Sequence, residues 1–370
     1  MINKDRLIDN FIDLIKINSP SFKEREIASA IEVELCGSGC EVVFQDYGES
    51  INLIAYKKGT NTKAPVLVLN AHMDTVEDTE AIRFEVTEDR IRSTGHTVLG
   101  SDDKSGIAQI LEALKVVDEL SIPHGDIEVV LTSAEEKGLV GAKHLENTLI
   151  KGRHALVLDS GGPVGNVIIG APTHITYTIT ITGKAAHAGI EPEKGLNSIR
   201  VASEIITSIP DGRIDASTTA NVGIINGGTA TNIVPKETMI KGEFRSHRRE
   251  TLERLRQGIF DTARTIAHRL SAPIEITDKV EYESFFIHDS DPFLKLVAGA
   301  HKRCGITPTF TITGGGSDAN IFNSKGIRAI NISNGMQMVH SPEEFILIED
   351  LIKGAEIIVE VIRLMGEDRQ

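Results

Sequence analysis

Histidine and carboxylate side chains follow several apolar stretches of this 370-residue chain. Nitrogen and oxygen ligands without cysteine suit Zn²⁺, Co²⁺ or Mn²⁺. Carboxylates crowded together repel one another, and bound divalent cations are the simplest way to keep them ionised and close. The sequence therefore predicts a site for divalent metal ions, with candidates in the motifs "NAHMDT", "GSDDK", "TSAEEKG", "LVLDS" and "MVHSPEE": His72, Asp74, Asp102, Asp103, Glu135, Glu136, Asp159 and His340.

The elements that must position these residues alternate between helical and strand patterns. Residues 107–120 have apolar positions at helical spacing, and residues 126–136 and 154–162 are strands that end in acids. This alternation predicts an α/β fold with a mostly parallel sheet flanked by helices. Side chains that leave the carboxyl ends of such strands converge on one crevice, which is where we expect the site.

The middle of the chain has a different pattern. Residues 174–188 begin with strict alternation, "HITYTITITG", and a helix, two strands, a second helix and a last strand follow. The order β-α-β-β-α-β is that of a ferredoxin-like domain. We therefore expect a domain over residues 173–282, inserted into a larger domain formed by residues 1–172 and 283–370.

The amino-acid composition limits the kinds of binding partner and the cellular compartment that we expect. The net charge of −14 argues against a nucleic-acid partner, which requires a surplus of Lys and Arg. The first 20 residues form an amphipathic helix pattern without an uninterrupted apolar run, so we expect neither a signal peptide nor membrane association. Three cysteines, an odd and sparse set, fit a reducing cytoplasm.

At the level of motifs, the chain resembles the M20 metallopeptidases, and among them the peptidase T-like aminotripeptidases. The segments "NAHMDTV", "LGSDDKSGIA", "TSAEEKGLVGA", "LVLDS" and "MVHSPEE" are similar to the five metal-site motifs of that family and occur in the same order. The resemblance covers essentially the whole chain. It implies a zinc-peptidase-like catalytic domain and assigns the inserted domain as a lid that also forms a homodimer.

The resemblance implies two metal ions per subunit, Zn²⁺ or alternatively Co²⁺ or Mn²⁺. His72 and Asp159 would bind one ion, His340 and Glu136 the other, and Asp102 would bridge both. The same resemblance makes Glu135 the general base, which accepts a proton from a hydroxide-forming water shared by the two ions.

Two further expectations concern the surroundings of the metals. We expect Asp74 to hydrogen-bond the far nitrogen of His72, because period-two spacing places the two side chains on the same side. The family has a non-proline cis peptide bond after the bridging aspartate, which here lies between Asp102 and Asp103.

Residues of the lid match family residues that contact the substrate. His187 in "TGKAAHAG" would stabilise the oxyanion, often across the dimer, and Arg245 would bind a substrate carboxylate. Asn232 matches a substrate-contacting asparagine, and Gly315 lies in a glycine-rich substrate loop over residues 313–320. Without the resemblance, a turn histidine and a surface salt bridge are the ordinary interpretations. A phosphate loop is the alternative for residues 313–320, but the Gly-Lys-Ser/Thr ending and the following helix geometry are lacking.

The hypothesis is thus a cytoplasmic metallo-aminopeptidase that hydrolyses the N-terminal peptide bond of tripeptides. A dipeptidase, a carboxypeptidase or an N-acyl amino-acid deacylase would use the same metal chemistry, and the sequence does not place the group that meets the free amine. A binding protein without activity would keep the fold but lose a ligand or the base, and a two-metal phosphatase would need a basic clamp. Side-chain preference and metal identity stay open.

Overall fold

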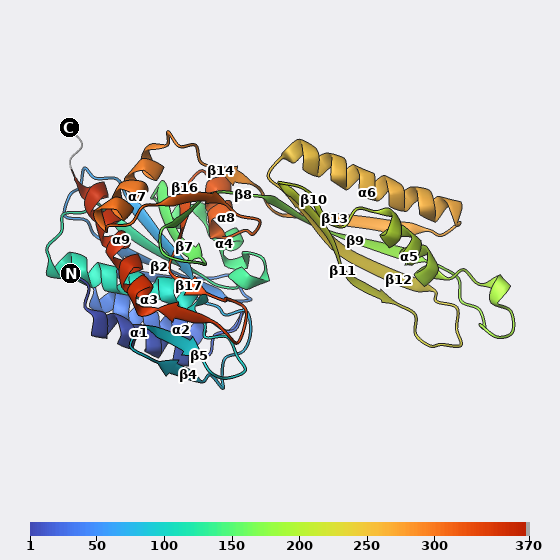
Figure 1. The fold of residues 1–370 in the computed structure, drawn as a ribbon, viewed down its shortest axis with the longest axis horizontal. Coiled ribbons are helices and arrows are strands. Elements are labelled where there is room, and N and C mark those ends of the chain that lie inside the picture. The colour runs from blue at the N-terminus through green and yellow to red at the C-terminus, as the bar shows by residue number, and fades with distance from the viewer. Residues whose placement is uncertain (368–370) are drawn as a thin grey trace. The chain divides into compact units, whose positions relative to one another are not determined.

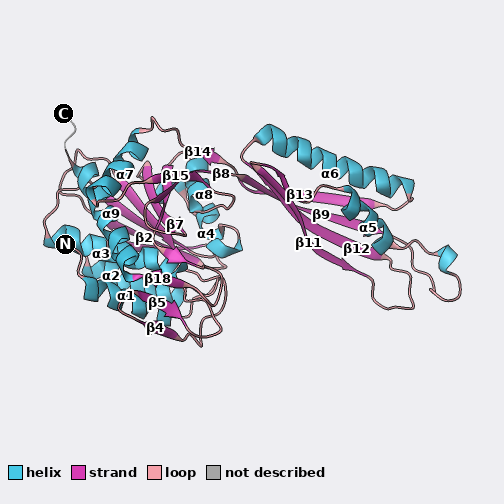
Figure 2. Cartoon of the chain, viewed as in Figure 1, coloured by secondary structure: helices cyan, strands magenta, loops and turns pink. Residues whose placement is uncertain are grey.

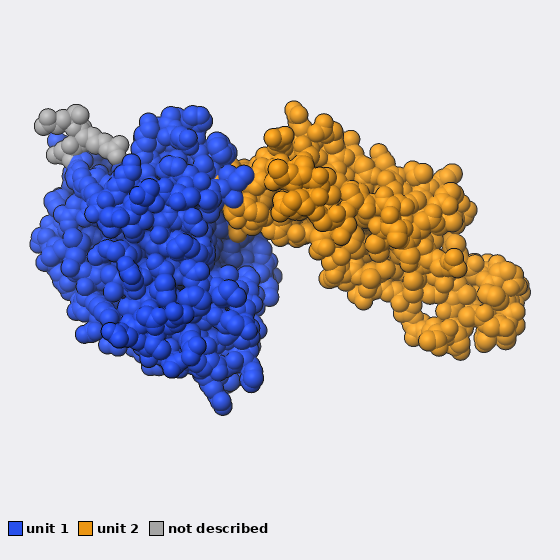
Figure 3. Space-filling model, viewed as in Figure 1, with its two compact units in different colours: residues 1–169, 286–312, 317–370 blue, residues 170–285, 313–316 orange. Residues whose placement is uncertain are grey.

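The computed structural model describes residues 1–367 and divides into two compact units (Figure 3). Unit 1 contains residues 1–169, 286–312 and 317–370, and unit 2 contains residues 170–285 and 313–316. The expected insertion, residues 173–282, falls within unit 2. The short segment 313–316 also belongs to unit 2, although it lies far along the chain from the rest.

The central sheet of unit 1 combines parallel and antiparallel strands (Figure 1). Its parallel part runs β6-β3-β7-β16, whereas β2 pairs antiparallel with β6, and β8 pairs antiparallel with β16. The sheet comprises β1 (Glu41–Asp46), β2 (Ile51–Lys57), β3 (Leu67–His72), β6 (Ile127–Thr132), β7 (His154–Ser160), β8 (Asn166–Ala171), β14 (Phe285–Phe286), β15 (Thr309–Ile312) and β16 (Arg328–Ser333).

Helices cover this sheet because its central strands are apolar throughout. Every residue of β3 and β6 is buried, as expected for parallel strands covered on both faces. Helix α3 packs on β3 and β7 and lies against α1 and α9, whereas α8 packs on β7 and β16. The helices of unit 1 are α1 (Lys4–Lys16), α2 (Arg25–Gly37), α3 (Ser101–Glu119), α4 (Val140–His144), α7 (Pro292–Arg303), α8 (Asp318–Ser324) and α9 (Ile348–Gly366).

Unit 1 also contains a second, antiparallel sheet of four short strands in the order β17-β18-β5-β4. These strands are β4 (Phe84–Val86), β5 (Arg90–Ser93), β17 (Met336–Gln337) and β18 (Phe345–Leu347). The sequence patterns did not predict this sheet, because its strands are two to four residues long and carry too little periodicity.

Unit 2 is a two-layer domain of one antiparallel sheet and two helices (Figure 2). The strand order β10-β11-β12-β9-β13 contains the ferredoxin-like arrangement, with β10 added at the edge. Alternate residues of β9 are buried among side chains of α5 and α6. The elements are β9 (Thr173–Thr182), α5 (Ser198–Ser208), β10 (Gly212–Asp215), β11 (Thr218–Gly227), β12 (Glu237–Ser246), α6 (Arg249–Arg269) and β13 (Ile274–Tyr282).

The predicted fold class, an α/β catalytic domain with an inserted ferredoxin-like domain, is confirmed. The structure extends the prediction at one important point: α3 spans Ser101–Glu119 rather than beginning near residue 107, and Asp102 and Asp103 near its start have non-helical backbone angles. Among the described residues, no helix has both the length and the apolar composition needed to cross a membrane.

Candidate metal centre

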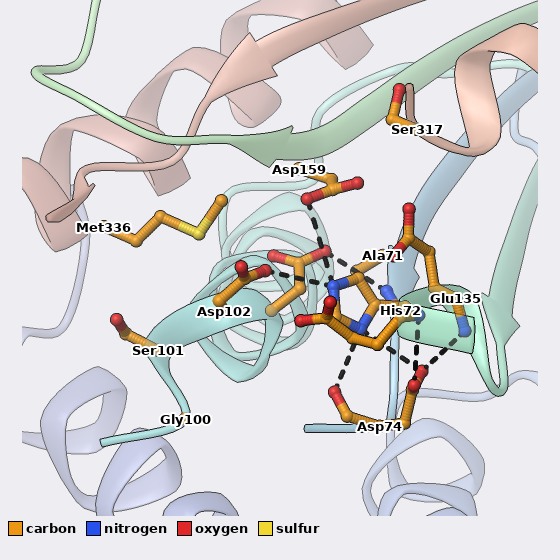
Figure 4. A network of polar contacts seen from close by, with 12 residues as sticks. Ala71, His72, Asp74, Gly100, Ser101, Asp102, Glu135, Asp159, Ser317 and Met336 are labelled. Carbon is orange, nitrogen blue, oxygen red and sulfur yellow. Dashed lines mark hydrogen bonds and ion pairs between the residues drawn. The ribbon is translucent and has the colours of Figure 1, made fainter. Parts of the chain in front are cut away.

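Three of the predicted ligands, His72, Asp102 and Asp159, lie together in unit 1 (Figure 4). Nε2 of His72 lies 3.0 Å from Oδ1 of Asp102 and 3.9 Å from Oδ1 of Asp159. One ligand atom from each side chain lies within 4.8 Å of the other two. Ligands at about 2.0–2.2 Å from a tetrahedral ion are roughly 3.4 Å apart. The geometry and the donor types of this group therefore fit a zinc-like ion.

A second group is formed by Asp102, Glu136 and His340. Nε2 of His340 lies 2.8 Å from Oε1 of Glu136 and 3.3 Å from Oδ2 of Asp102. Asp102 thus offers Oδ1 to the first group and Oδ2 to the second. A carboxylate that presents one oxygen to each group can join two ions, so this arrangement suits a two-metal site.

The sequence predicted that all five ligands follow strand ends of one sheet. The structure shows that only some of them do. His72 ends β3, Asp159 lies at the end of β7, and Glu136 lies in a 3₁₀ turn, Glu135–Lys137, after β6. Asp102 lies instead in the kinked, non-helical start of α3, and His340 follows β17 of the small sheet. The candidate ligands therefore come from the start of a helix and from a loop of the second sheet as well as from strand ends of the central sheet.

Burial and crowding shift the pKa values of these groups strongly. Burial, reinforced by neighbouring carboxylates, raises the pKa of Glu135 and of Asp159 well above the usual range. Burial also opposes ionisation of Asp102, but hydrogen bonds with His340 and His72 lower its pKa below the usual range. Hydrogen bonds with Asp102 and Glu136 raise the pKa of His340 to about 10. Divalent ions bound among these acids and histidines would balance the charge of the carboxylates.

Asp74 contacts both the imidazole and the turn that carries Glu135 (Figure 4). Nδ1 of His72 lies 3.0 Å from the Asp74 carbonyl oxygen and 3.4 Å from its carboxylate, so the backbone is the nearer partner. The carboxylate accepts hydrogen bonds from the backbone N–H groups of Glu135, at 3.0 Å, and Glu136, at 3.3 Å. The sequence suggested only the contact with His72. Asp74 also fixes the backbone of the acidic pair.

Two buried carboxylates beside the ligands were not assigned a role from the sequence. The expected cis peptide bond joins Asp102 to Asp103, and the Asp103 carboxylate accepts from the His72 backbone N–H at 3.1 Å. Glu344, the last acid of "HSPEE", accepts from the backbone N–H groups of Gly100 and Asp102 at 2.9 and 3.0 Å. Adjacent acid pairs in "SDDK" and "SPEE" were the only sequence signal for these supporting residues.

Comparison with known proteins identifies the family. The profile of peptidase family M20/M25/M40 matches residues 68–364, which is more than half of the chain. The chain belongs to this family. The M20 assignment agrees with the order of the five motifs and with the two groups of candidate ligands.

One curated relative matches nearly the whole chain, and another matches three quarters of it. The protein YqjE of Bacillus subtilis, described as uncharacterized, is 38% identical over 98% of this chain and 99% of its own length. Peptidase T of Escherichia fergusonii is 28% identical over 75% of this chain and 68% of its own length. The chain is therefore an enzyme of the M20 peptidases with peptidase T-like relatives.

Solved structures of M20 peptidases superpose closely on this fold. The aminopeptidase PepT of Bacillus cereus is 36% identical, covers 99% of this chain and 100% of its own, and has a TM-score of 0.91. A tripeptidase of Staphylococcus aureus is 34% identical, covers 99% of both chains and has a TM-score of 0.94.

His187 and Asn232 lie on adjacent exposed loops of unit 2. His187 forms an isolated β-bridge with Ile233, and the Asn232 carbonyl oxygen accepts from the backbone N–H of Ala188 at 3.0 Å. The structure therefore brings these two predicted M20 residues together. Their contacts with a substrate stay predictions.

Arg245 is already paired within unit 2. Its Nε and Nη2 atoms donate to the two carboxylate oxygens of Glu243 at 2.9 and 3.1 Å, and Nη1 lies 3.3 Å from the Tyr282 hydroxyl oxygen and the Gly314 carbonyl oxygen. A substrate carboxylate would have to compete with Glu243 for this guanidinium.

In the glycine-rich loop, the surrounding side chains exclude a Cβ atom at Gly316 but not at the predicted Gly315. A Cβ atom on Gly315 would meet only the Thr313 hydroxyl, at 3.7 Å, whereas one on Gly316 would lie 2.3 Å from the Tyr282 ring. A short helix does begin within the predicted loop: Ser317 caps α8, so residues 318–320 form its first turn.

Proposed function

We propose that this M20 enzyme is a two-metal aminopeptidase that removes the N-terminal residue of tripeptides. The observation that carries this proposal is the pair of ligand groups that share Asp102, with Glu135 on the adjoining turn. The similarity to the Bacillus cereus aminopeptidase and the Staphylococcus aureus tripeptidase supports the substrate class.

Each ligand group has its own place in the proposed mechanism. His72 and Asp159 would hold one ion, Glu136 and His340 the other, and Asp102 would contact both. Zn²⁺, or Co²⁺ or Mn²⁺ in its place, would supply Lewis acidity towards the scissile carbonyl and an acidified water. Asp103 and Glu344 support this set through the His72 and Asp102 backbone N–H groups.

Glu135 is the proposed general base. Its carboxylate takes a proton from the attacking water and passes it to the nitrogen of the leaving amine, so one water is consumed for each peptide bond broken. Asp74 holds the Glu135 backbone N–H at 3.0 Å and thereby keeps the carboxylate beside the ligand groups.

Unit 2 is proposed to serve as a lid and as the contact between the two subunits of a homodimer. His187 would stabilise the oxyanion, while Arg245, Asn232 and the loop around Gly315 would bind the peptide. Lid closure would exclude water and bring these groups to the substrate. We propose a cytoplasmic location, in keeping with the sparse cysteines.

A free tripeptide and its N-acetylated form distinguish this proposal from its rivals. The metal-loaded enzyme should cleave only the free peptide, and Glu135→Gln should lower the rate by at least about 10²–10⁴-fold with metal still bound. Glu343→Gln, which changes the exposed first acid of "PEE", is the control and should keep the wild-type rate.

Three other results of this experiment would contradict parts of the proposal. Cleavage of the acetylated peptide would keep the metal chemistry and indicate a deacylase or carboxypeptidase. A Glu135→Gln variant with a near-normal rate would rule out this base, and no turnover of either peptide would refute the peptidase proposal.

A further inference from the structure

The turn that carries Glu135 is held by side chains from three distant parts of unit 1. In residues 133–136, four successive backbone N–H groups each donate to a side-chain oxygen. Ser133 donates to Asn52 at 3.2 Å, and Ala134 donates to Glu24 at 2.8 Å. The next two N–H groups donate to Asp74. Side chains from outside the turn therefore accept from all four donors, while the carbonyl oxygens of residues 133–135 accept from the backbone of residues 138–141.

Ala134 most needs such an external acceptor. Its φ of 48° and ψ of 41° place it in the left-handed region, which costs a residue with a Cβ atom about 1–2 kcal/mol. The residue is fully buried, so water cannot pair with its N–H group. The Glu24 oxygen satisfies this donor and so stabilises the conformation that orients the next residue, Glu135.

Glu24 is itself held in place from several sides. It is fully buried at the start of α2, and its Oε1 atom also accepts from the Phe22 backbone N–H at 2.9 Å. Its Oε2 atom accepts from the Ser50 hydroxyl. The carboxylate therefore has little freedom to move away from the Ala134 N–H group.

The segment of residues 17–24, between α1 and α2, contacts the strand end as well as the turn. The Ser19 hydroxyl donates to the Met73 carbonyl oxygen at 2.9 Å, and the Ser21 hydroxyl donates to the Asp74 carboxylate at 2.7 Å. One segment thus holds Asp74 and, through Glu24, Ala134. Both of these residues contact or adjoin Glu135.

We infer that Glu24 is a positioning residue for the general base. It acts through the Ala134 N–H group and orients the Glu135 backbone without touching the substrate or the ligand atoms. This inference rests on the proposed role of Glu135. It explains why a buried carboxylate is kept at the start of α2, where it caps no backbone N–H of its own helix.

A matched control lies on β6, the strand that leads into the same turn. Glu128 is 2% exposed and accepts from the backbone N–H groups of Lys151 and Gly152 at 3.0 Å. It shares residue type, burial and backbone pairing with Glu24. It lies near the start of β6, whereas the catalytic turn follows the end of this strand.

The test compares Glu24→Ala with Glu128→Ala in the metal-loaded enzyme on a free tripeptide, at a temperature where both are folded. We expect Glu24→Ala to lower kcat by roughly 10–100-fold, with KM within about threefold and metal content unchanged. Glu128→Ala should keep kcat within about threefold of wild type. Glu24→Gln, whose amide oxygen can still accept, should restore most of kcat.

Three results would overturn the inference: a normal kcat in Glu24→Ala, equal losses in both alanine variants, or a glutamine variant as slow as the alanine variant. If Glu24→Ala does not fold, Glu24→Asp replaces it. The aspartate side chain is one methylene shorter and its carboxylate falls short of the Ala134 N–H group, so we again expect a lower kcat with little change in KM.

Amide hydrogen exchange gives a readout that does not depend on turnover. Loss of the Glu24 acceptor should speed exchange of the Ala134 and Glu135 amides in the resting enzyme, and Glu128→Ala should leave them unchanged. Unchanged exchange in Glu24→Ala would overturn the positioning role. An inactive wild type would refute only the proposed function.

Discussion

The Glu243 carboxylate in unit 2 is shared between two basic side chains. Arg245 donates to both of its oxygens, and Nε2 of His174 lies 2.9 Å from Oε2. The close approach of His174, followed by the hydrogen bonds with Arg245, lowers the pKa of Glu243 from 4.5 to about 2. The charged form therefore stabilises the folded state.

This shift predicts a pH-dependent effect of Glu243→Gln. A carboxylate with a depressed folded-state pKa contributes its full stability above pH 4.5 and loses it as the pH falls through 2. The variant should be less stable than wild type by about 1 kcal/mol at pH 7, a value reduced by partial solvent exposure. Urea unfolding at pH 7 and pH 3 measures this gap, which should be smaller at pH 3. An equal gap at both pH values would contradict the assignment.

At the level of elements, the short connection from β6 to α4 must bend tightly to bring Glu135 and Glu136 beside the candidate ligands. Gly138 has a φ of 95° and Ala134 and Leu139 also lie in the left-handed region. Gly141 closes the bend by donating its N–H to the Ser133 carbonyl oxygen at 2.9 Å. The backbone at Gly141 is therefore closely surrounded by other atoms, whereas Gly138 has free space around it.

Two glycine substitutions test this description of the connection. A Cβ atom on Gly141 would lie 2.4 Å from Oδ1 of Asn52 and 2.5 Å from the Ser133 carbonyl oxygen, whereas one on Gly138 would meet nothing within 4 Å. Gly141→Ala should therefore cost about 1–3 kcal/mol in unfolding free energy and lower kcat. Gly138→Ala should cost only the backbone strain, about 1–2 kcal/mol, with kcat unchanged. Denaturation and peptide hydrolysis measure both, and a larger kcat loss at Gly138 would refute the description.

For the whole molecule, the candidate ligands join parts of the chain that are distant in sequence. His72 and His340 lie near opposite ends, and both contact Asp102. Two metal ions bound there would together link β3, α3, β7, the turn after β6 and the segment after β17. Binding to the folded state alone stabilises a protein by mass action, about 2.7 kcal/mol for each site at a hundredfold excess over Kd.

Metal removal should therefore lower the unfolding midpoint by several degrees, and added Zn²⁺ should restore it. Far-UV circular dichroism suits this measurement because the chain contains no tryptophan. Asp102→Asn removes the carboxylate shared by both groups, so its midpoint should respond far less to Zn²⁺. Equal midpoints of the wild type with chelator and with Zn²⁺ would contradict a two-metal site.

The sequence by itself determined the fold class, the longer elements and the family of this protein. Alternating apolar patterns such as "HITYTITIT" and the helical spacing in residues 249–269 are local properties, and local packing against a core preserves them. The ligand types and the order of the five motifs were also readable, because metal binding restricts each position to a few residue types.

Only the tertiary structure decided which partners these residues meet. Glu24 and Ala134 are separated by 110 residues, and no periodicity links them. The pairing of Arg245 with Glu243 and the steric demand at Gly316 likewise depend on side chains that neighbour them in space. Sequence patterns record which face of an element is buried, whereas hydrogen-bond partners depend on how the elements pack.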